Sequence, residues 1–429
     1  MFIKPANWNQ LSREEKRKLR LDHWEKAEGL QFESPAAEAC YRERAHRLRQ
    51  AYDLATPDRI IADLSMGAGE YTLRRKGLNG RALVYDHEKM IEPVIEFNRE
   101  FQPDLAVNAF PYPGRTLDIL DLQTYIWAGQ KLPESQVIQA VEAEYMTADE
   151  YLDFAADPTA FWTKQYLPRA FGALGPMAMM PDWPRVSEIV DVAGMVIPFG
   201  LPPVQEMLKK LMAAGEAALQ WASVLGQIGG TLASAGFPSM ASAFVKTPFD
   251  FLGDTLRGTR GILMDMYRHP KELMAATEAY VPILIKTITQ ACDQMGAPVA
   301  MYPLHKGADG FMSQKQFEKF YWPPFKAVML GLYEEGIINY LFVEGTYDSR
   351  LETIAEMPKG SALWHFDKTD MRKVKEVLSD KFTIAGNVPA SLASTGSTDD
   401  MRRYCDDLVD LYTGAPGFIM AFGCGFEMT

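Results

Sequence analysis

The chain has 429 residues, of which 47% are hydrophobic and 23% charged, the ordinary composition of a globular protein with a large core. Its formal net charge of −12 argues against a general affinity for nucleic acid or for an anionic membrane surface, since either would require a basic patch. Four cysteines without close spacing, and an N-terminus without an apolar signal segment, predict a cytoplasmic protein with free thiols.

The first hundred residues are predicted to form a helical N-terminal extension (1–100), followed by one catalytic domain (101–429). Residues Leu11 to Leu54 are dense in charge, which is typical of helices with solvated faces. The glycines in Ser65–Glu70 do not make a dinucleotide fingerprint, because Thr72 stands where the third glycine is needed. This segment is therefore predicted to be a turn.

The stretch from Ala217 to Val245 contains no charged residue. Its length raises the question of a membrane span, but its glycines and a proline make it a poor spanning helix. Two buried or interfacial helices are favoured, and a mobile cover over an apolar pocket is the alternative. We expect this stretch to lie against the catalytic face or a subunit interface, and an interface of this kind would make the protein a homodimer.

Apolar runs of four to seven residues recur along the chain and read as buried parallel strands, each followed by a polar group. The first is Leu105–Phe110; the later runs with the polar residues after them are Pro298–Leu304 before His305, Ile338–Val343 before Glu344, Ser361–Trp364 before His365, Lys381–Ala385 before Asn387, and Gly417–Phe422 before Cys424. Eight strands result if Glu142–Met146 and either Val190–Val196 or Ala241–Lys246 are included. The alternation with helical segments predicts an α/β fold, a (β/α)8 barrel with an N-terminal helical extension and a helical insertion.

Side chains that follow the strands of such a barrel converge on one face. We therefore expect Glu344, His365 and Cys424 to be neighbours in space. His305 and Asp309 follow another strand and are expected on the same face, as is Asp367, which comes two residues after His365.

Several motifs in the C-terminal half resemble the uroporphyrinogen decarboxylase superfamily, which includes zinc-dependent methyltransferases that serve corrinoid proteins. They are Trp364–Met371, Ala385–Pro389, Thr395–Ser397 with Asp399 and Asp400, and Gly423–Gly425. The resemblance implies a (β/α)8 barrel. The paired arginines of the decarboxylase branch are not found between Asn98 and Gly114, and the methyltransferase His-x-Cys pair is replaced by Glu344-Gly345-Thr346.

Within this resemblance, Glu344, His365 and Cys424 are expected to bind Zn²⁺, because carboxylate, imidazole and thiolate are zinc ligands and a catalytic site uses three of them. Asp367 replacing His365, or adding to it, is the main variant. The implied activity moves a methyl group from a small methoxylated substrate, with an apolar or aromatic body, to the corrinoid of a partner protein.

The expected catalytic residues are His305, Asp309 and Asp367, which would protonate the departing oxygen or orient a ligand. The expected substrate-binding residues are Arg257, Asp118, Tyr347 and Asn387, although a structural ion pair for Arg257 and a turn-fixing role for Asn387 remain open. The alternative function is a metal-free decarboxylase or lyase acting on a carboxylated substrate. A non-enzymatic binding barrel is the third hypothesis.

Overall fold

The structure is a computed structural model that describes residues 1–181, 186–239 and 243–425. Its central element is a parallel sheet in the strand order β1-β9-β8-β7-β6-β5-β4. The strands of this sheet are β1 (Ile61–Asp63), β4 (Ala243–Phe244), β5 (Val299–Leu304), β6 (Ile338–Val343), β7 (Ala362–Phe366), β8 (Thr383–Gly386) and β9 (Phe418–Ala421). A separate antiparallel pair is formed by β2 (Tyr125–Trp127) and β3 (Ile138–Ala140).

The two edge strands of the parallel sheet are joined through the extended segment 104–109. The Asp104 amide donates to the Ala62 carbonyl at 3.3 Å, and the Ala106 amide donates to the Pro238 carbonyl at 2.9 Å, shortly before β4. This segment forms no strand of the seven-stranded sheet, but the two bonds place it between β1 and the residues before β4, where a (β/α)8 barrel has its eighth strand. The predicted strand Leu105–Phe110 is extended backbone next to β1, but it is not a strand of the sheet.

The first barrel strand is β1, which pairs with β9 in parallel register from Ile61 opposite Ile419. The predicted N-terminal extension (1–100) therefore contains one strand of the parallel sheet in addition to its helices. A three-residue strand gives too short an apolar run to be recognised in a charged region.

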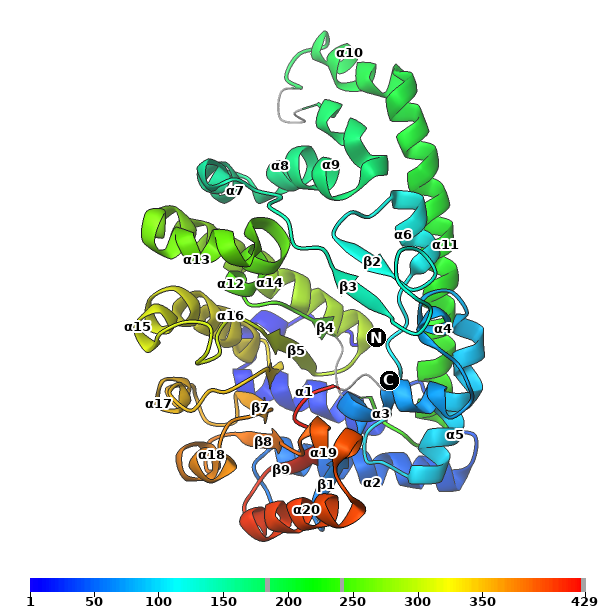
Figure 1. Cartoon of the computed structure of the whole chain (residues 1–429), viewed down its shortest axis with the longest axis vertical. Helices are drawn as coiled ribbons and strands as arrows, with labels where there is room; N and C mark the ends of the chain where they lie inside the picture. Colours follow the sequence, from blue (N-terminus) through cyan, green and yellow to red (C-terminus); the bar gives the residue numbers. More distant parts are fainter. Residues whose placement is uncertain (182–185, 240–242, 426–429) are drawn as a thin grey trace.

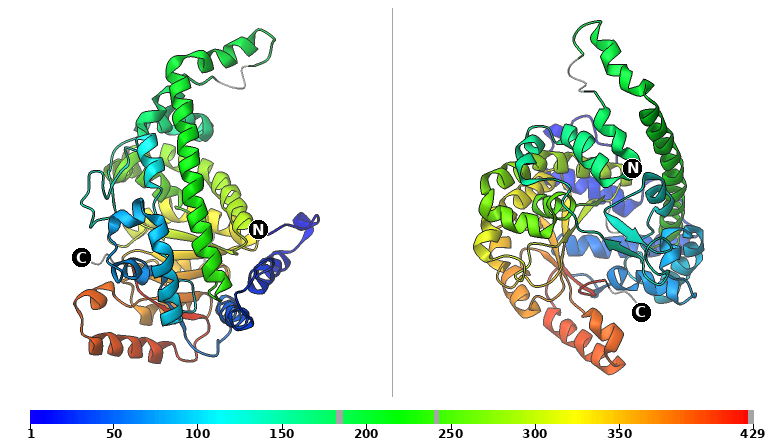
Figure 2. Two further views of the ribbon diagram at one scale, coloured as in Figure 1. Left: turned by 90° about the vertical axis from the view of Figure 1, so that its right-hand side faces the viewer. Right: turned by 45° about the horizontal axis from the view of Figure 1, so that its top comes forward.

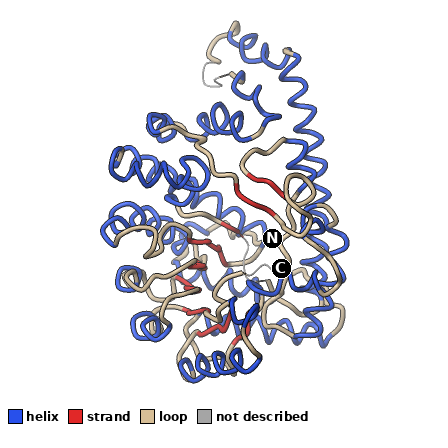
Figure 3. Tube along the Cα trace, viewed as in Figure 1, coloured by secondary structure: helices blue, strands red, loops and turns tan. Residues whose placement is uncertain are grey.

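Helices surround the sheet (Figures 1 and 3). In the first half they are α1 (Arg13–Lys26), α2 (Pro35–Tyr52), α3 (Ser65–Arg74), α4 (Gly80–Val84), α5 (Ile91–Phe101), α6 (Gly114–Leu120), α7 (Tyr151–Ala156), α8 (Pro158–Phe161), α9 (Leu167–Ala170), α10 (Asp191–Val196) and α11 (Pro202–Ser234). In the second half they are α12 (Pro248–Phe251), α13 (Gly258–Arg268), α14 (Pro270–Met295), α15 (Gln314–Gln316), α16 (Trp322–Glu334), α17 (Leu351–Ile354), α18 (Met371–Leu378), α19 (Ala390–Thr395) and α20 (Thr398–Tyr412). Short 3₁₀ and π segments are η1 (Trp8–Gln10), η2 (His87–Met90), η3 (Ala148–Glu150), η4 (Trp162–Tyr166), η5 (Gly172–Met179), η7 (Ile197–Gly200), η8 (Leu252–Arg257) and η9 (Phe317–Tyr321).

Alternate residues of the strands face opposite sides of the barrel wall. Leu341 and Val343 of β6 pack into the outer core with the surrounding helices. Tyr340 and Phe342 of the same strand belong to a second cluster with Ile419 of β9 and other inward-facing residues. The second cluster also contains apolar side chains of α1 and α2, namely Leu21, Trp24, Tyr41, Ala45 and Leu48. The charged N-terminal helices thus cover one end of the barrel interior with their apolar faces.

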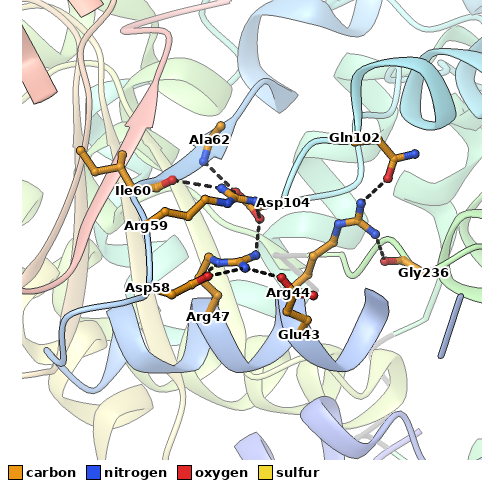
Figure 4. Close-up of polar contacts among 10 residues, drawn as sticks. All are labelled: Glu43, Arg44, Arg47, Asp58, Arg59, Ile60, Ala62, Gln102, Asp104 and Gly236. Carbon is orange, nitrogen blue, oxygen red and sulfur yellow. Dashed lines mark hydrogen bonds and ion pairs between the residues drawn. The ribbon is translucent and has the colours of Figure 1, made fainter. Parts of the chain in front are cut away.

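A buried ionic network fastens α2 to the barrel wall (Figure 4). Asp104 is 1% exposed and Arg47 is 2% exposed, and their side chains lie 2.8 Å apart. Asp104 also accepts hydrogen bonds from Arg59 and from the Ala62 amide of β1. The Asp104 carboxylate therefore holds together helix α2, strand β1 and the extended segment 104–109.

Helix α11 forms one side of the molecule and, with α10 at its end, extends beyond the barrel (Figures 1 and 2). The uncharged stretch 217–245 begins in the C-terminal part of the single helix α11, which ends at Ser234. Phe244, near the end of the stretch, lies in β4. Two separate helices were expected here. Ile228 and Leu232 are buried against the helices that follow β1, whereas Leu219 is exposed. Among the described residues, no helix has the length and apolar character needed to cross a membrane.

Two further strand predictions were wrong. The segment Val190–Val196 forms helix α10, and Glu142–Met146 lies in no strand, just after β3. Both segments lie in the part of the chain between β3 and β4, where the apolar residues pack on helices and do not form a sheet. Short apolar runs do not distinguish a strand from a short helix, which is why the patterns misled.

Candidate active site

His305 is held at the carboxyl end of β5 by two acidic side chains. Its Nδ1 lies 2.6 Å from Asp254 Oδ2, and its Nε2 lies 3.6 Å from Glu344 Oε1. Burial lowers the pKa of His305, but the hydrogen bond and charge of Asp254 outweigh this effect, so the pKa is raised above its ordinary value. An imidazole with a raised pKa retains its proton nearer to neutral pH and can act as a general acid.

Asp254 is itself stabilised as a carboxylate by cations on both flanks. Lys246 Nζ lies 3.0 Å from its Oδ2, and Lys306 Nζ contacts its Oδ1. Although burial alone would raise the pKa of Asp254, the hydrogen bond to His305 and the two lysines hold it well below its usual range. The residue therefore stays ionised and orients the Nδ1–H of His305.

Asp250 fixes the backbone on which His305 stands. It accepts hydrogen bonds from the amides of His305 at 3.3 Å and Lys306 at 2.8 Å, and from the Tyr321 hydroxyl at 2.7 Å. The side chain is fully buried, and burial raises its pKa. It is a positioning residue.

A cavity of about 740 Å³ opens where β1, β6, β7 and β9 end. Among the described residues its lining is acidic and aromatic: Ser65, Gly69, Glu70, Leu83, Asn108, Phe110, Tyr112, Phe342, Glu344, Gly345, Asp367, Lys368, Cys424 and Gly425. A smaller cavity of about 370 Å³ lies beside His305 and Asp254. Glu344 lines the larger cavity and contacts His305, which lines the smaller, so this pair links the two cavities.

The turn after β9 brings Cys424 next to Asp367. A side chain at Gly423 would meet the backbone of Asp367 at 2.9–3.0 Å, so only glycine permits this approach. Burial raises the pKa of the Cys424 thiol, and the charge and hydrogen bond of Asp367 raise it further. Burial, together with the neighbouring carboxylates, also raises the pKa of Glu344. Three of the predicted residues, Glu344, Asp367 and Cys424, thus share the cavity.

His365 does not join them. It lies within β7 and faces the barrel interior, fully buried. Its Nε2 donates to the Phe422 carbonyl at 2.6 Å, and its Nδ1 accepts from the Tyr340 hydroxyl at 2.6 Å. Burial lowers its pKa to about 4, so the ring is neutral at pH 7. Neither nitrogen is left for a metal.

The expected zinc site of Glu344, His365 and Cys424 therefore does not fit this arrangement. Within the ranges that the structure describes, no group of three or more His, Cys, Asp or Glu side chains is arranged to hold a metal ion. The variant with Asp367 in place of His365 brings its members to one cavity, where the charge and hydrogen bond of Asp367 raise the pKa of the Cys424 thiol.

Replacing Tyr340 by Phe is expected to lower the free energy of unfolding by about 1–2 kcal/mol, because it removes the partner of a buried histidine nitrogen. The change should show as a lower thermal midpoint. Tyr333→Phe is the control, since the Tyr333 hydroxyl donates to the Lys359 carbonyl at 3.3 Å in a partly exposed position. Equal midpoints for the two variants would contradict the interior role of His365.

Two predicted substrate-binding residues have structural partners instead. Arg257 is 5% exposed, and its Nε lies 2.7 Å from Asp265, while its Nη1 contacts Glu144 and the Met146 carbonyl. Asp118, in α6, accepts a hydrogen bond from the Tyr85 hydroxyl at 2.9 Å. Neither Arg257 nor Asp118 lines the two cavities at the strand ends.

Three other candidates hold the loops around the site. Asn387 donates to the carbonyls of Asp367 and Thr369 at 3.1 and 3.2 Å, so it shapes the loop after β7. Tyr347 is fully buried and packs so closely on the backbone that a side chain at Gly307 would meet its hydroxyl. Asp309 accepts from Ser349 Oγ at 2.7 Å and joins the loops after β5 and β6. Through these contacts the three residues position loops, and none of them lines the two cavities at the strand ends.

Asp254, the partner of His305, was not among the predicted site residues. It lies in η8, the short helical turn that follows β4 and α12. The available signal was its position after an expected strand, together with Lys246 and Asp250.

The profile of the family described as uroporphyrinogen decarboxylase (URO-D) matches residues 204–429, more than half of the chain. The chain belongs to this family. The matched region contains β4 to β9, and therefore His305, Asp254, Glu344, Asp367 and Cys424, so the site described above is built mainly from the part of this URO-D protein that carries the family signature. The resemblance inferred from the sequence motifs is confirmed.

Among solved structures, this URO-D protein is similar to a methyltransferase from Methanosarcina mazei. The two share 12% sequence identity with a TM-score of 0.57, over 90% of this chain and 93% of the other. At this identity the likeness establishes a common fold. A search of curated protein sequences finds no match.

Proposed function

We propose that this URO-D protein is a methyltransferase that takes a methyl group from a small methoxylated substrate and delivers it to the corrinoid of a separate protein. The observation that carries the proposal is His305, held between Asp254 and Glu344 at the strand ends of the barrel. The fold shared with a methyltransferase supports it. The reduced corrinoid, brought by its own protein, would supply the nucleophile for the methyl carbon.

The residues of this chain have two tasks in such a reaction. Phe110, Tyr112 and Phe342 line the larger cavity and suit a substrate with an apolar or aromatic body. When the carbon–oxygen bond breaks, its electron pair stays on the oxygen, which must be neutralised. His305 donates its Nε2 proton to this oxygen, and Asp254 stabilises the imidazole in its protonated form. No step through zinc is included, because the expected ligand set does not fit.

The cavity charge disfavours the alternative, a decarboxylase acting on a carboxylated substrate. Among the described lining residues, Glu70, Glu344 and Asp367 are acidic and Lys368 is the one cation. Arg257, which was expected to bind a substrate carboxylate, is committed to Asp265 and Glu144. A carboxylated substrate would therefore meet repulsion without a compensating arginine.

Product analysis distinguishes the two activities. The purified protein is incubated anaerobically with reduced cobalamin and either methoxylated or carboxylated aromatic compounds. We expect the methyl group of a methoxylated compound to appear on cobalamin, with the matching hydroxyl product detected by mass spectrometry. Release of carbon dioxide from a carboxylated compound, without methyl transfer, would contradict the proposal.

The rate of methyl transfer should depend on pH through His305. Because its pKa is raised, the protonated acid is fully present at low pH and is lost as pH rises through the pKa of the folded enzyme. We expect kcat/KM to fall on the alkaline side of this pKa. Asp254→Asn removes the interaction that raises the pKa, so the fall should begin at lower pH. A profile with the same alkaline limb in both proteins would exclude His305 as the acid.

A further inference from the structure

Helix α11 carries a line of exposed residues along most of its length. Its inner face packs on α5 and α6, and in the left-hand view of Figure 2 it runs along the side of the molecule that faces the reader. The exposed positions are separated alternately by four and three residues, the spacing at which two helices keep one line of contact. These positions, called the outer line here, are Gln205, Lys209, Met212, Glu216, Leu219, Ser223, Gly226 and Gly230.

Two glycines of the outer line have no role in the packing of this chain. A Cβ at Gly226 or Gly230 would meet no atom within 4 Å, and neither residue has a positive φ. Because glycine in a helix interior is less favourable than alanine, the fold itself does not account for them. Small residues on a helix surface let another element approach closely. Met212, which is 64% exposed, and Leu219, which is 73% exposed, offer apolar contact on the same line.

The protruding end of the molecule beyond α11 is apolar and exposed. This tip, residues 186–197, includes α10 and extends beyond the barrel (Figure 1). Its exposed aliphatic residues are Val186, Ile189, Val190, Val192, Val196 and Ile197, of which Ile189 is 91% exposed. Exposed apolar patches of this kind mark interaction surfaces.

The charges on the outer line are complementary under a two-fold rotation. Within the ranges that the structure describes, Glu216 has no ion-pair partner. Lys209 lies 3.7 Å from Glu206 in a pair that is exposed on both sides and therefore weak. Lys209 and Glu216 are equally far from the point between Met212 and Ala213. When two copies of α11 are laid antiparallel about this point, Lys209 of each copy faces Glu216 of the other.

The same arrangement carries the tip of one copy toward the glycine end of the other. Gly226 and Gly230 lie about 20–26 Å from the centre of the pairing, at 1.5 Å per residue. In the opposite direction α11 begins at Pro202, about 16 Å from that centre, and the tip continues beyond it. The bulky aliphatic residues of one copy thus meet the small residues of the other.

Two other occupants fit this surface less well. Residues 186–201 contain Glu188 and Asp191 but no lysine or arginine, whereas a helix that binds an anionic membrane surface carries basic residues. A protein that delivers a corrinoid has to reach the cavities at the strand ends, and no residue of α11 lines either of them.

We propose that the outer line of α11 is a homodimer interface, in which two copies pack antiparallel about Met212 and each tip covers the glycine end of its partner. The glycines, the exposed tip and the paired charges are three different features, and one arrangement accounts for all of them. The net charge of −12 does not oppose this contact, because residues 217–234 of α11 carry no charge.

Sedimentation equilibrium of the full-length protein over a range of concentrations tests the proposal. We expect a reversible dimer of twice the chain mass. Lys209→Glu and Glu216→Lys should each weaken dimerisation at least about tenfold, because each creates two like-charge contacts. The two changes combined in one chain should restore dimerisation to within about threefold of the native chain, since both pairs form again with reversed sign.

Lys210→Glu is the matched control for Lys209→Glu. It makes the same charge change one residue further along, about 100° around the helix from the outer line, and should leave dimerisation within about threefold of the native chain. Gly230→Glu should weaken dimerisation at least about tenfold, because it places bulk and negative charge against the acidic tip, and it should still fold, because a Cβ at Gly230 meets nothing.

A monomer at every concentration would overturn the inference, and so would a monomer that instead co-sediments with phosphatidylglycerol vesicles. A dimer that Lys209→Glu and Lys210→Glu weaken alike, that the double reversal does not restore, or that Gly230→Glu leaves unchanged would also overturn it.

Discussion

Replacing His305 by Gln is expected to lower kcat/KM for methyl transfer by about 10²–10⁴-fold, the range lost when a general acid is removed. Gln occupies a similar volume and can still donate to Asp254, but it cannot release a proton to the departing oxygen. The thermal midpoint should change little, because His305 lies at the mouth of the barrel with 32% of its side chain exposed.

His46→Gln is the control for this variant. His46 also pairs with a carboxylate, at 2.9 Å from Glu25, but its side chain is 60% exposed on α2 at the other end of the barrel. It should retain full activity. Comparable activity of His305→Gln and the control would remove His305 from the mechanism. If the histidine is the acid, the His305→Gln variant should lose less activity toward a substrate whose oxygen is a better leaving group.

Replacing Asp104 by Asn is expected to cost about 3–5 kcal/mol of folding free energy, because it leaves the buried Arg47 without its buried counter-charge. The loss should be larger than for a surface pair because the same carboxylate also binds Arg59 and the Ala62 amide (Figure 4). Denaturant and thermal unfolding, followed by circular dichroism, would measure it.

Asp58→Asn is a matched control, since Asp58 binds the same arginine at 2.6 Å but leaves 65% of its side chain exposed. Water screens this pair, so the expected cost is below about 1 kcal/mol. Equal unfolding midpoints for Asp104→Asn and Asp58→Asn would show that the buried contacts of Asp104 do not stabilise the packing of α2 on β1.

The C-terminal half of the barrel could be predicted from sequence because its strands are continuous apolar runs. The run Ile338–Val343 is β6 to the residue, and Val299–Leu304 is β5 within the predicted segment. The helix start at Ser313 was also predictable, since its side chain accepts from the Gln316 amide in a capping box. In contrast, β1 is too short to give a periodic signal, and its place in the barrel follows from its long-range pairing with β9. The predicted strand Ala241–Lys246 contains β4, and its first two residues lie outside the described ranges.

The candidate site shows the same division. Glu344 and His305 were placed correctly at strand ends because the preceding runs were long. His365 was misplaced because β7 continues two residues beyond the predicted end at Trp364, which leaves His365 inside the strand and makes Asp367 the first residue after it. A shift of this size changes a side chain from the mouth of a barrel to its interior. Asp254 depends on tertiary contact with His305, which no local pattern encodes.

The account depends most on His305 holding its proton at the mouth of the barrel. The direct measurement is an NMR pH titration of the protein with isotope-labelled histidine, with the His305 signal assigned through His305→Gln. We predict that His305 titrates above its ordinary value and that Asp254→Asn lowers its midpoint. A His305 midpoint at or below the ordinary histidine value, unchanged by Asp254→Asn, would contradict the proposal that this residue is the catalytic acid.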